Sequence, residues 1–396
     1  MPKSKSPSDP SLAGASAPSA TSPELPDLMT RETPPAPRSK SRVLVYGANG
    51  YTGQLVVEAA IKRGWKPIVA GRNRAAVDAV AAAHGLEARV FELQSGEQIA
   101  PHLGDVAVVL HCAGPFARTF RPMLDGCLEA GAHYLDITGE VEVFEGVAAR
   151  TLDCERRGIV AMPGVGFDVV PSDCLAAHLA RRLPKADTLE LAFKMRGGRA
   201  SHGTLTTMVE NLHRGSLVRR DGRLVHIATG EIVREIDFGP GANGESKPPV
   251  HCAAIPWGDV STAYRTTRIP NIAVFVPVSK TAAFAARVST PLRGVLGTDF
   301  IQRLMKKRIA GQPVGPSAEE RKSATVVMWG EATRKDGQKV VSRLVTPEGY
   351  SLTALTSVMA AERVLAGDVR PGYQTPALAF GPDFVMTVPG VERIDL

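Results

Sequence analysis

Residues 42–53 read Arg-Val-Leu-Val-Tyr-Gly-Ala-Asn-Gly-Tyr-Thr-Gly, and the prediction of the fold starts from this segment. Its first five residues form an apolar run that ends in glycine, as a buried parallel strand does. Residues 52–63 then carry apolar side chains at helical spacing until Gly64 ends the pattern. A glycine-rich loop between a strand and a helix is typical of the first unit of a dinucleotide-binding fold.

Three glycines give this loop its expected chemistry. Gly47 permits a tight turn, Gly50 lets the backbone approach a pyrophosphate, and Gly53 allows the helix to pack closely. The first turn of the helix offers free N–H groups and a positive dipole end to the phosphates. Glycine is common and a plain turn is the alternative, but the position between strand and helix favours a cofactor. We expect cofactor contacts from Gly47, Asn49, Gly50, Tyr51, Thr52 and Gly53.

The end of the second predicted strand indicates which dinucleotide binds. An NAD enzyme usually places Asp or Glu there to hold the ribose 2′-hydroxyl, but this chain has Arg72 within Ala-Gly-Arg-Asn-Arg. A guanidinium can hold a 2′-phosphate by paired hydrogen bonds. A solvated arginine at a helix start is the alternative, and we favour NADP(H).

Strands and helices alternate from residue 42 to about residue 170. Further strands are expected at 67–71, 88–93, 106–112, 133–138 and 159–162, with helices at 74–84, 121–130 and 141–157. This order predicts an α/β domain with a Rossmann-like, doubly wound parallel sheet over residues 42–170.

The pattern changes after Pro171. Strand-like runs at 189–195, 224–227, 273–278, 324–329 and 340–345 are separated in two places by the turn signals Asp221-Gly222 and Asp336-Gly337. We therefore expect a second α+β domain, built on an antiparallel sheet, over residues 171–348 for substrate binding or oligomerisation. Residues 349–396 contain a helix at 352–365 that we expect to pack back on the first domain. Residues 1–41, rich in Pro, Ser and Ala, predict a disordered tail.

Composition narrows the class of protein. The 396 residues are 44% apolar and 22% charged, with a net charge of +7, and the basic residues are scattered. This argues against a nucleic-acid surface and allows anionic ligands such as a phosphorylated cofactor or an acyl thioester. The five cysteines form no CxxC pair, so we expect reduced thiols and no metal site.

The chain has no uninterrupted run of 18 apolar residues, and we expect a cytoplasmic protein. The segment 279–309 alternates apolar residues with Arg and Lys, so it allows peripheral membrane contact, although ordinary amphipathic helices explain it as well. A homo-oligomer is also allowed.

Ligands of open α/β sheets lie beyond the carboxyl ends of the strands. The backbone of Ala113, Gly114 and Pro115 is therefore expected to contact the nicotinamide. Asp168, after the sixth strand, is the first candidate for proton transfer, with helix capping as its alternative. We also consider as substrate contacts Phe116, Asp136, Glu140, Asp259 and Tyr264, for which packing, helix-start or hairpin roles are alternatives.

No tyrosine is followed by lysine four residues later, which weakens a short-chain dehydrogenase interpretation. The segments at 46–53, 113–116, 134–140 and 166–173 (Gly-Phe-Asp-Val-Val-Pro-Ser-Asp) instead resemble the saccharopine dehydrogenase-like NADP-binding family. The last segment is also similar to trans-acting enoyl reductases, and 255–259 and 374–377 resemble family segments too. Arg268 departs from the pattern, since glycine is expected there.

The resemblance implies an NADP(H)-dependent oxidoreductase with a small-molecule substrate. An enoyl thioester or lipid intermediate would be reduced at C=C, and an amino-acid imine at C=N. The apolar stretch 282–300 favours the acyl case. The alternative is a non-catalytic NADP-binding or lipid-associated scaffold.

Overall fold

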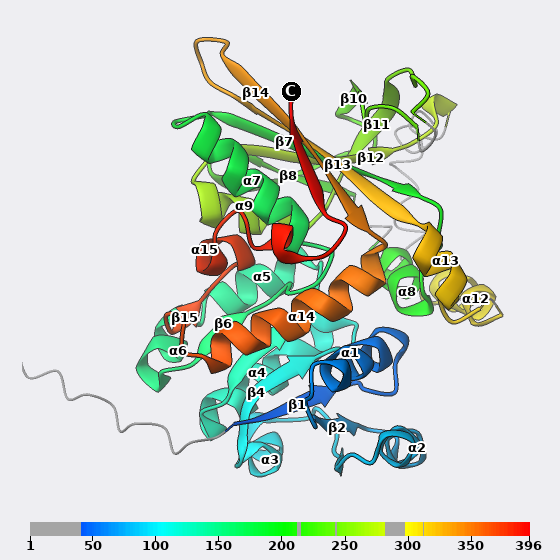
Figure 1. The fold of residues 1–396 in the computed structure, drawn as a ribbon, viewed down its shortest axis with the longest axis vertical. Coiled ribbons are helices and arrows are strands. Elements are labelled where there is room, and N and C mark those ends of the chain that lie inside the picture. Colours follow the sequence, from blue (N-terminus) through cyan, green and yellow to red (C-terminus); the bar gives the residue numbers. More distant parts are fainter. Residues whose placement is uncertain (1–40, 212–214, 242–243, 282–297, 312) are drawn as a thin grey trace, which may run out of the picture. The chain divides into compact units, whose positions relative to one another are not determined.

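The computed structural model describes residues 41–211, 215–241, 244–281, 298–311 and 313–396. The predicted disordered tail therefore lies outside the described residues apart from Ser41. Most of the apolar stretch 282–300 also lies outside them. The described part of the chain is organised around two sheets (Figure 1).

The first sheet has seven strands, and every recorded pairing within it is parallel. In spatial order they are β15 (Gly372–Tyr373), β6 (Val160–Met162), β5 (His133–Asp136), β4 (Val106–His111), β1 (Arg42–Tyr46), β2 (Ile68–Gly71) and β3 (Ala88–Val90). The chain reverses direction across the sheet between β1 and β4, where doubly wound folds bind their ligands. The predicted Rossmann-like sheet is confirmed.

Helices cover both faces of this sheet. They are α1 (Tyr51–Lys62), α2 (Arg74–His84), α3 (Gly96–Ile99), the 3-10 helix η1 (Ala100–Leu103), α4 (Phe116–Ala130), α5 (Val141–Ala148) and α6 (Thr151–Arg157). Neighbouring residues of β1 point to opposite faces, so Val45 joins the core under α1 and Leu44 the core under α4. The predicted helix 141–157 is two helices, with a break at 149–150.

The end of the chain returns to the first sheet. Strand β15 extends that sheet beside β6, and the preceding helix α14 (Gly349–Leu365) packs against α1 (Figure 1). Tyr51 and Tyr350 begin these helices with ring centroids 5.1 Å apart, and twelve residues further on Arg63 pairs with Glu362 at 2.6 Å. The two contacts are separated by twelve residues in both helices and follow the same order along the chain. Helices α1 and α14 therefore run parallel, with their N-termini at the same edge of the sheet.

The second sheet has nine strands. They are β7 (Thr188–Arg196), β8 (Ser216–Arg220), β9 (Arg223–Ile227), β10 (Val233–Ile236), β11 (Val250–Ile255), β12 (Asn271–Pro277), β13 (Thr325–Thr333), β14 (Lys339–Pro347) and β16 (Glu392–Asp395). The sheet is mixed, because β12 and β7 run parallel whereas the other recorded pairs are antiparallel. Both predicted hairpins, β8–β9 and β13–β14, are present.

Helices of this region surround the sheet and connect it to the first one. They are α7 (Val170–Arg182), α8 (His202–Asn211), α9 (Asp259–Thr267), α12 (Asp299–Ala310), α13 (Ala318–Ser323), α15 (Pro376–Phe380) and the 3-10 helix η4 (Val385–Thr387). Arg268 ends α9 with φ of 62°, so the arginine at the expected glycine position adopts the left-handed conformation that usually favours glycine. No described helix is long and apolar enough to cross a membrane.

Candidate active site

The loop after β1 is built so that only glycine fits at two positions. Gly47 has φ of 82°, and a Cβ atom there would lie 2.9 Å from Ala113. A Cβ atom on Gly53 would lie 2.1 Å from the carbonyl oxygen of Gly47, so α1 packs directly on the loop. Gly50 and Asn49 are exposed at the turn. The expected tight turn and close helix packing are therefore found in the structure.

The first turn of α1 is open to an anion. Gly50 is its N-cap without a side-chain hydrogen bond, and the described residues offer no acceptor for the N–H groups of Tyr51, Thr52 and Gly53. Such N–H groups at a helix N-terminus bind phosphate oxygens.

Arg72 follows β2 at the same edge of the sheet and is exposed. Within the described ranges, no hydrogen bond or ion pair holds its guanidinium. The next residue, Asn73, caps α2 by accepting a hydrogen bond from the backbone N–H of Ala76 at 3.1 Å. Arg72 therefore lies beside the phosphate loop, and its guanidinium N–H groups are available to bind a ligand.

Tyr51 links the phosphate loop to the second half of the chain. Its hydroxyl donates to the Pro316 carbonyl oxygen at 2.6 Å and accepts from Arg321 at 2.8 Å. Its ring meets Tyr350 edge-on, and Glu348 caps α14 by accepting from the N–H groups of residues 350 and 351. The sequence pattern did not reveal that two helix N-termini meet here, because the second helix lies 300 residues away.

Two of the candidate substrate-binding residues use their carboxylates in hydrogen bonds within the protein. The Glu140 carboxylate accepts the backbone N–H groups of Phe116 and Ala117, both at 2.9 Å, and so caps α4. The buried Asp136 carboxylate accepts from the Tyr134 hydroxyl at 2.6 Å and from the N–H groups of Thr138 and Gly164 at 2.9 Å. Burial nevertheless raises the pKa of Asp136 to about 6, against the effect of these bonds.

Asp168 differs from both of these acids. No hydrogen bond holds its carboxylate within the described residues, and its oxygen would lie 2.8 Å from a Cβ atom on Gly139, so it packs against the loop after β5. Burial, followed by the nearby charge of Glu140, raises the pKa of Asp168 to about 7. Helix capping does not explain this residue, because α7 begins after Val169 without a side-chain cap. A carboxyl group with a pKa in this range is a candidate for proton transfer near neutral pH.

An aromatic cluster, formed by Phe167, Phe193 and Trp257, lies next to Asp168. The Phe193 ring is 6.1 Å from that of Phe167 and 4.6 Å from that of Trp257, and the Trp257 indole donates to the backbone oxygen of Asp168 at 2.7 Å. All three side chains are half-buried. These residues are far apart in the sequence, at positions 167, 193 and 257, so no local pattern predicted the cluster.

The last two candidates lie on α9. Asp259 is completely buried at the start of this helix. Tyr264 packs on the Arg219 guanidinium, 4.2 Å from the ring centroid, beside the turn at Gly222. The structure thus brings Asp136, Glu140 and Asp168 to one edge of the first sheet and places Tyr264 against the β8–β9 hairpin.

Comparisons with known proteins agree with this geometry. Residues 43–162 match the family model of the saccharopine dehydrogenase NADP-binding domain. The fold resembles that of apo saccharopine dehydrogenase (L-Glu forming) from Saccharomyces cerevisiae, with a TM-score of 0.62 and 12% identity over 90% of this chain and 100% of the other. These findings define the class of protein: an oxidoreductase with an NADP-binding domain of the saccharopine dehydrogenase type.

Relatives within this class carry two kinds of name. A Mycobacterium tuberculosis protein named as a trans-acting enoyl reductase is 24% identical over 88% of this chain and 95% of its own length. The trans-acting enoyl reductase of Mycobacterium ulcerans is 30% identical over 50% of this chain and 51% of its own length. The human saccharopine dehydrogenase-like oxidoreductase is 28% identical over 33% of this chain and 35% of its own length. The resemblance predicted from the sequence is confirmed.

Proposed function

We propose that this chain is an NADP(H)-dependent reductase that delivers hydride to a polarised C=C bond of an acyl thioester or lipid intermediate, or to a C=N bond. One observation carries the proposal: a carboxyl group that titrates near pH 7, Asp168, lies beside half-buried aromatic rings at the sheet edge that also holds the phosphate loop.

The residues present fit the cofactor. The glycine turn gives the backbone room for a pyrophosphate, and the unpartnered N–H groups of α1 provide its hydrogen-bond donors. The Arg72 guanidinium suits the 2′-phosphate that distinguishes NADP(H) from NAD(H). Ala113, Gly114 and Pro115, after β4, would border the nicotinamide. When bound, the cofactor supplies or accepts the hydride.

The protein must manage one proton for each hydride. When a C=C bond conjugated to a carbonyl is reduced, hydride adds to the β-carbon and a proton to the α-carbon; for C=N the proton goes to nitrogen. Asp168 holds a proton below about pH 7 and can donate it. The aromatic cluster excludes water and offers an apolar contact for an acyl chain. The enoyl reductase names of the relatives agree with the C=C case.

The five cysteines are free thiols, which agrees with a reducing compartment, and the cytoplasm is part of this proposal. A homo-oligomer and contact with a membrane surface stay predictions. Of the segment 279–309 that suggested such contact, residues 282–297 lie outside the described part of the chain.

A fluorescence titration with NADPH and NADH tests the proposal. We expect Arg72→Ala to weaken NADPH binding by about ten- to a hundredfold and leave NADH binding nearly unchanged, since the charged hydrogen bonds are worth about 1.5–3 kcal/mol. Arg156→Ala, on α6 with a side chain 76% exposed, is the control. Absence of binding by either nucleotide would contradict the reductase. NADPH binding without oxidation by any enoyl thioester or imine would instead favour the non-catalytic scaffold.

A further inference from the structure

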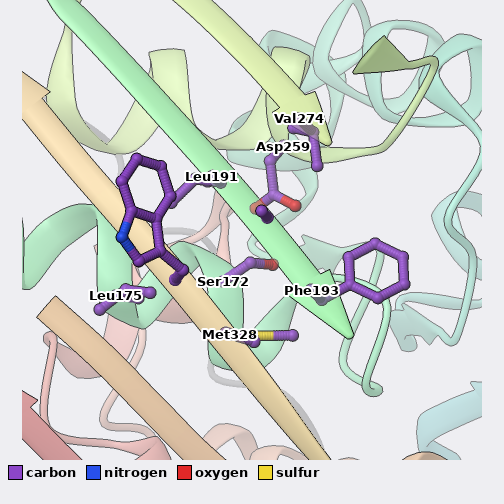
Figure 2. Close-up of a pocket in the computed structure, with 9 residues that line it drawn as sticks. Ser172, Leu175, Leu191, Phe193, Asp259, Val274 and Met328 are labelled. Carbon is purple, nitrogen blue, oxygen red and sulfur yellow. The ribbon is translucent and has the colours of Figure 1, made fainter. Parts of the chain in front are cut away.

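Asp259 and Arg321 are two ionisable side chains that form no ion pair within the described residues. Asp259 lies among apolar side chains between the second sheet and α7 (Figure 2). Burial there raises the pKa of its carboxyl well above the ordinary value, so the protonated, neutral form is favoured and needs no cation. The guanidinium of Arg321 cannot lose its charge in this way. Its surroundings therefore have to explain it.

Arg321 extends from α13 to the helix that follows the phosphate loop. Its Nη1 donates to the Tyr51 hydroxyl at 2.8 Å and to the Pro316 carbonyl oxygen at 3.0 Å. Gly315 packs on the Tyr51 ring so closely that a Cβ atom there would lie 2.6 Å from it. The half-buried guanidinium is thus held at the residue that begins α1. Its other N–H groups have no acceptor among the residues that the structure describes.

The N-terminus of α1 differs from those of the neighbouring helices in having no carboxylate. Glu140 caps α4, Glu348 caps α14, and Glu320 completes a capping box on α13. Each acid complements the positive end of a helix dipole. Helix α1 has no acidic residue in its first turn and no side-chain cap, and it has Arg321 nearby instead. A cation beside a positive helix end is unfavourable until an anion lies between them.

We propose that Arg321 binds the pyrophosphate of NADP(H), so that the second half of the chain completes the phosphate site begun by the glycine loop. The anion is that of the cofactor, since residues 43–162 match an NADP-binding domain. While Nη1 stays on the Tyr51 hydroxyl, the remaining N–H groups provide charge-assisted hydrogen bonds to phosphate oxygens. The inference rests on the cofactor of the proposed function and not on the bond that is reduced.

This role is distinct from that of Arg72. The 2′-phosphate expected at Arg72 exists only in NADPH, whereas the pyrophosphate is common to NADPH and NADH. Loss of Arg321 should therefore weaken both nucleotides by the same factor, and loss of Arg72 should weaken NADPH alone. The ratio of the two affinities separates the two sites.

Fluorescence titrations of the full chain with NADPH and NADH test the proposal. We expect Arg321→Gln to weaken both nucleotides about tenfold or more, as the loss of charged hydrogen bonds does. Arg321→Lys keeps the charge but not the paired donors, and should lose less. Lys322→Gln removes the same charge from the next, exposed residue of α13 and is the control that should change neither affinity.

A second variant guards against misfolding of the first. Tyr51→Phe keeps the ring but removes the hydroxyl that holds the guanidinium, so it should weaken both nucleotides several-fold. Unchanged affinities in folded Arg321→Gln, or in Tyr51→Phe, overturn the proposal. Weaker binding of NADPH alone in Arg321→Gln overturns it too, because the arginine would then serve the 2′-phosphate. These outcomes are measured by binding, so they are distinguished from a failure of the reduction, which is measured by NADPH oxidation.

Discussion

Replacing Asp168 by Asn should make the protein more stable at alkaline pH and leave its stability unchanged in acid. The pKa of this carboxyl rises from 3.8 to about 7 in the folded state. Below pH 4 the group is protonated in both states and contributes nothing. Between pH 4 and 7 the unfolded chain loses the proton while the folded chain keeps it, so the free energy of unfolding falls as pH rises.

The size of the effect follows from the same pKa. At about 1.4 kcal/mol per unit of pKa, the full loss above pH 7 is about 4 kcal/mol. Asp168 keeps partial contact with solvent, so we expect about 2 kcal/mol. The amide of Asn does not ionise in this pH range. The free energy of unfolding of Asp168→Asn should therefore exceed that of the wild type by this amount at pH 8.

Urea denaturation at pH 4, 6 and 8 measures the difference directly. Asp136 also has a raised pKa, but Asp168 is not among its causes, so the contribution of Asp136 is the same in both proteins and cancels. Asp78→Asn serves as the exposed control. A stability difference that is the same at all three pH values would refute the reasoning. If Asp168 donates the proton, kcat/KM of the wild type should also fall above about pH 7, and the variant should be inactive with intact NADPH binding.

Three further predictions each concern a substitution that alters the contacts of one residue. Gly53→Ala places a methyl group against the Gly47 carbonyl oxygen, so we expect a loss of about 1–3 kcal/mol in unfolding free energy and of NADPH binding in the fluorescence titration. Glu145→Gln leaves the Arg219 guanidinium, 6% exposed, without its charged partner, and urea denaturation should show a loss of about 3 kcal/mol. Tyr51→Phe removes the hydroxyl that joins the phosphate loop to two partners across the chain, which should cost about 1 kcal/mol and lower the melting temperature. An unchanged melting temperature would mean that this link is weak in solution.

The sequence pattern correctly predicted those elements whose conformation depends on residues close together in the chain. The strand–loop–helix unit at 42–63 and the hairpin turn at Asp221-Gly222 appear where expected, and both turn residues have positive φ, 47° and 76°. Asp168 was placed at the sheet edge because it follows the sixth strand. The division of the chain at residues 170 and 348 stays a prediction.

Contacts between distant residues could not be predicted in this way. The helix predicted from 121 begins at Phe116, because Glu140 caps it from 24 residues away. The burial of Asp259 depends on how α7 and the second sheet enclose it. Nothing in the sequence distinguishes a buried aspartate at a helix start from an exposed one. Phe193 and Trp257 meet only because β7 and the segment before α9 converge.

The parallel sheet that binds the nucleotide is completed by β15, and its face by α14, both from the last fifty residues of the chain. A ribosome therefore releases the segment 43–162 long before the strand and helix that complete its sheet. Until then β6 has an open edge and the apolar surface beside α1 is uncovered, as in a nascent chain that needs protection from aggregation. Any attempt to express the nucleotide-binding half alone should meet the same difficulty, and supplying residues 349–396 as a separate fragment should relieve it.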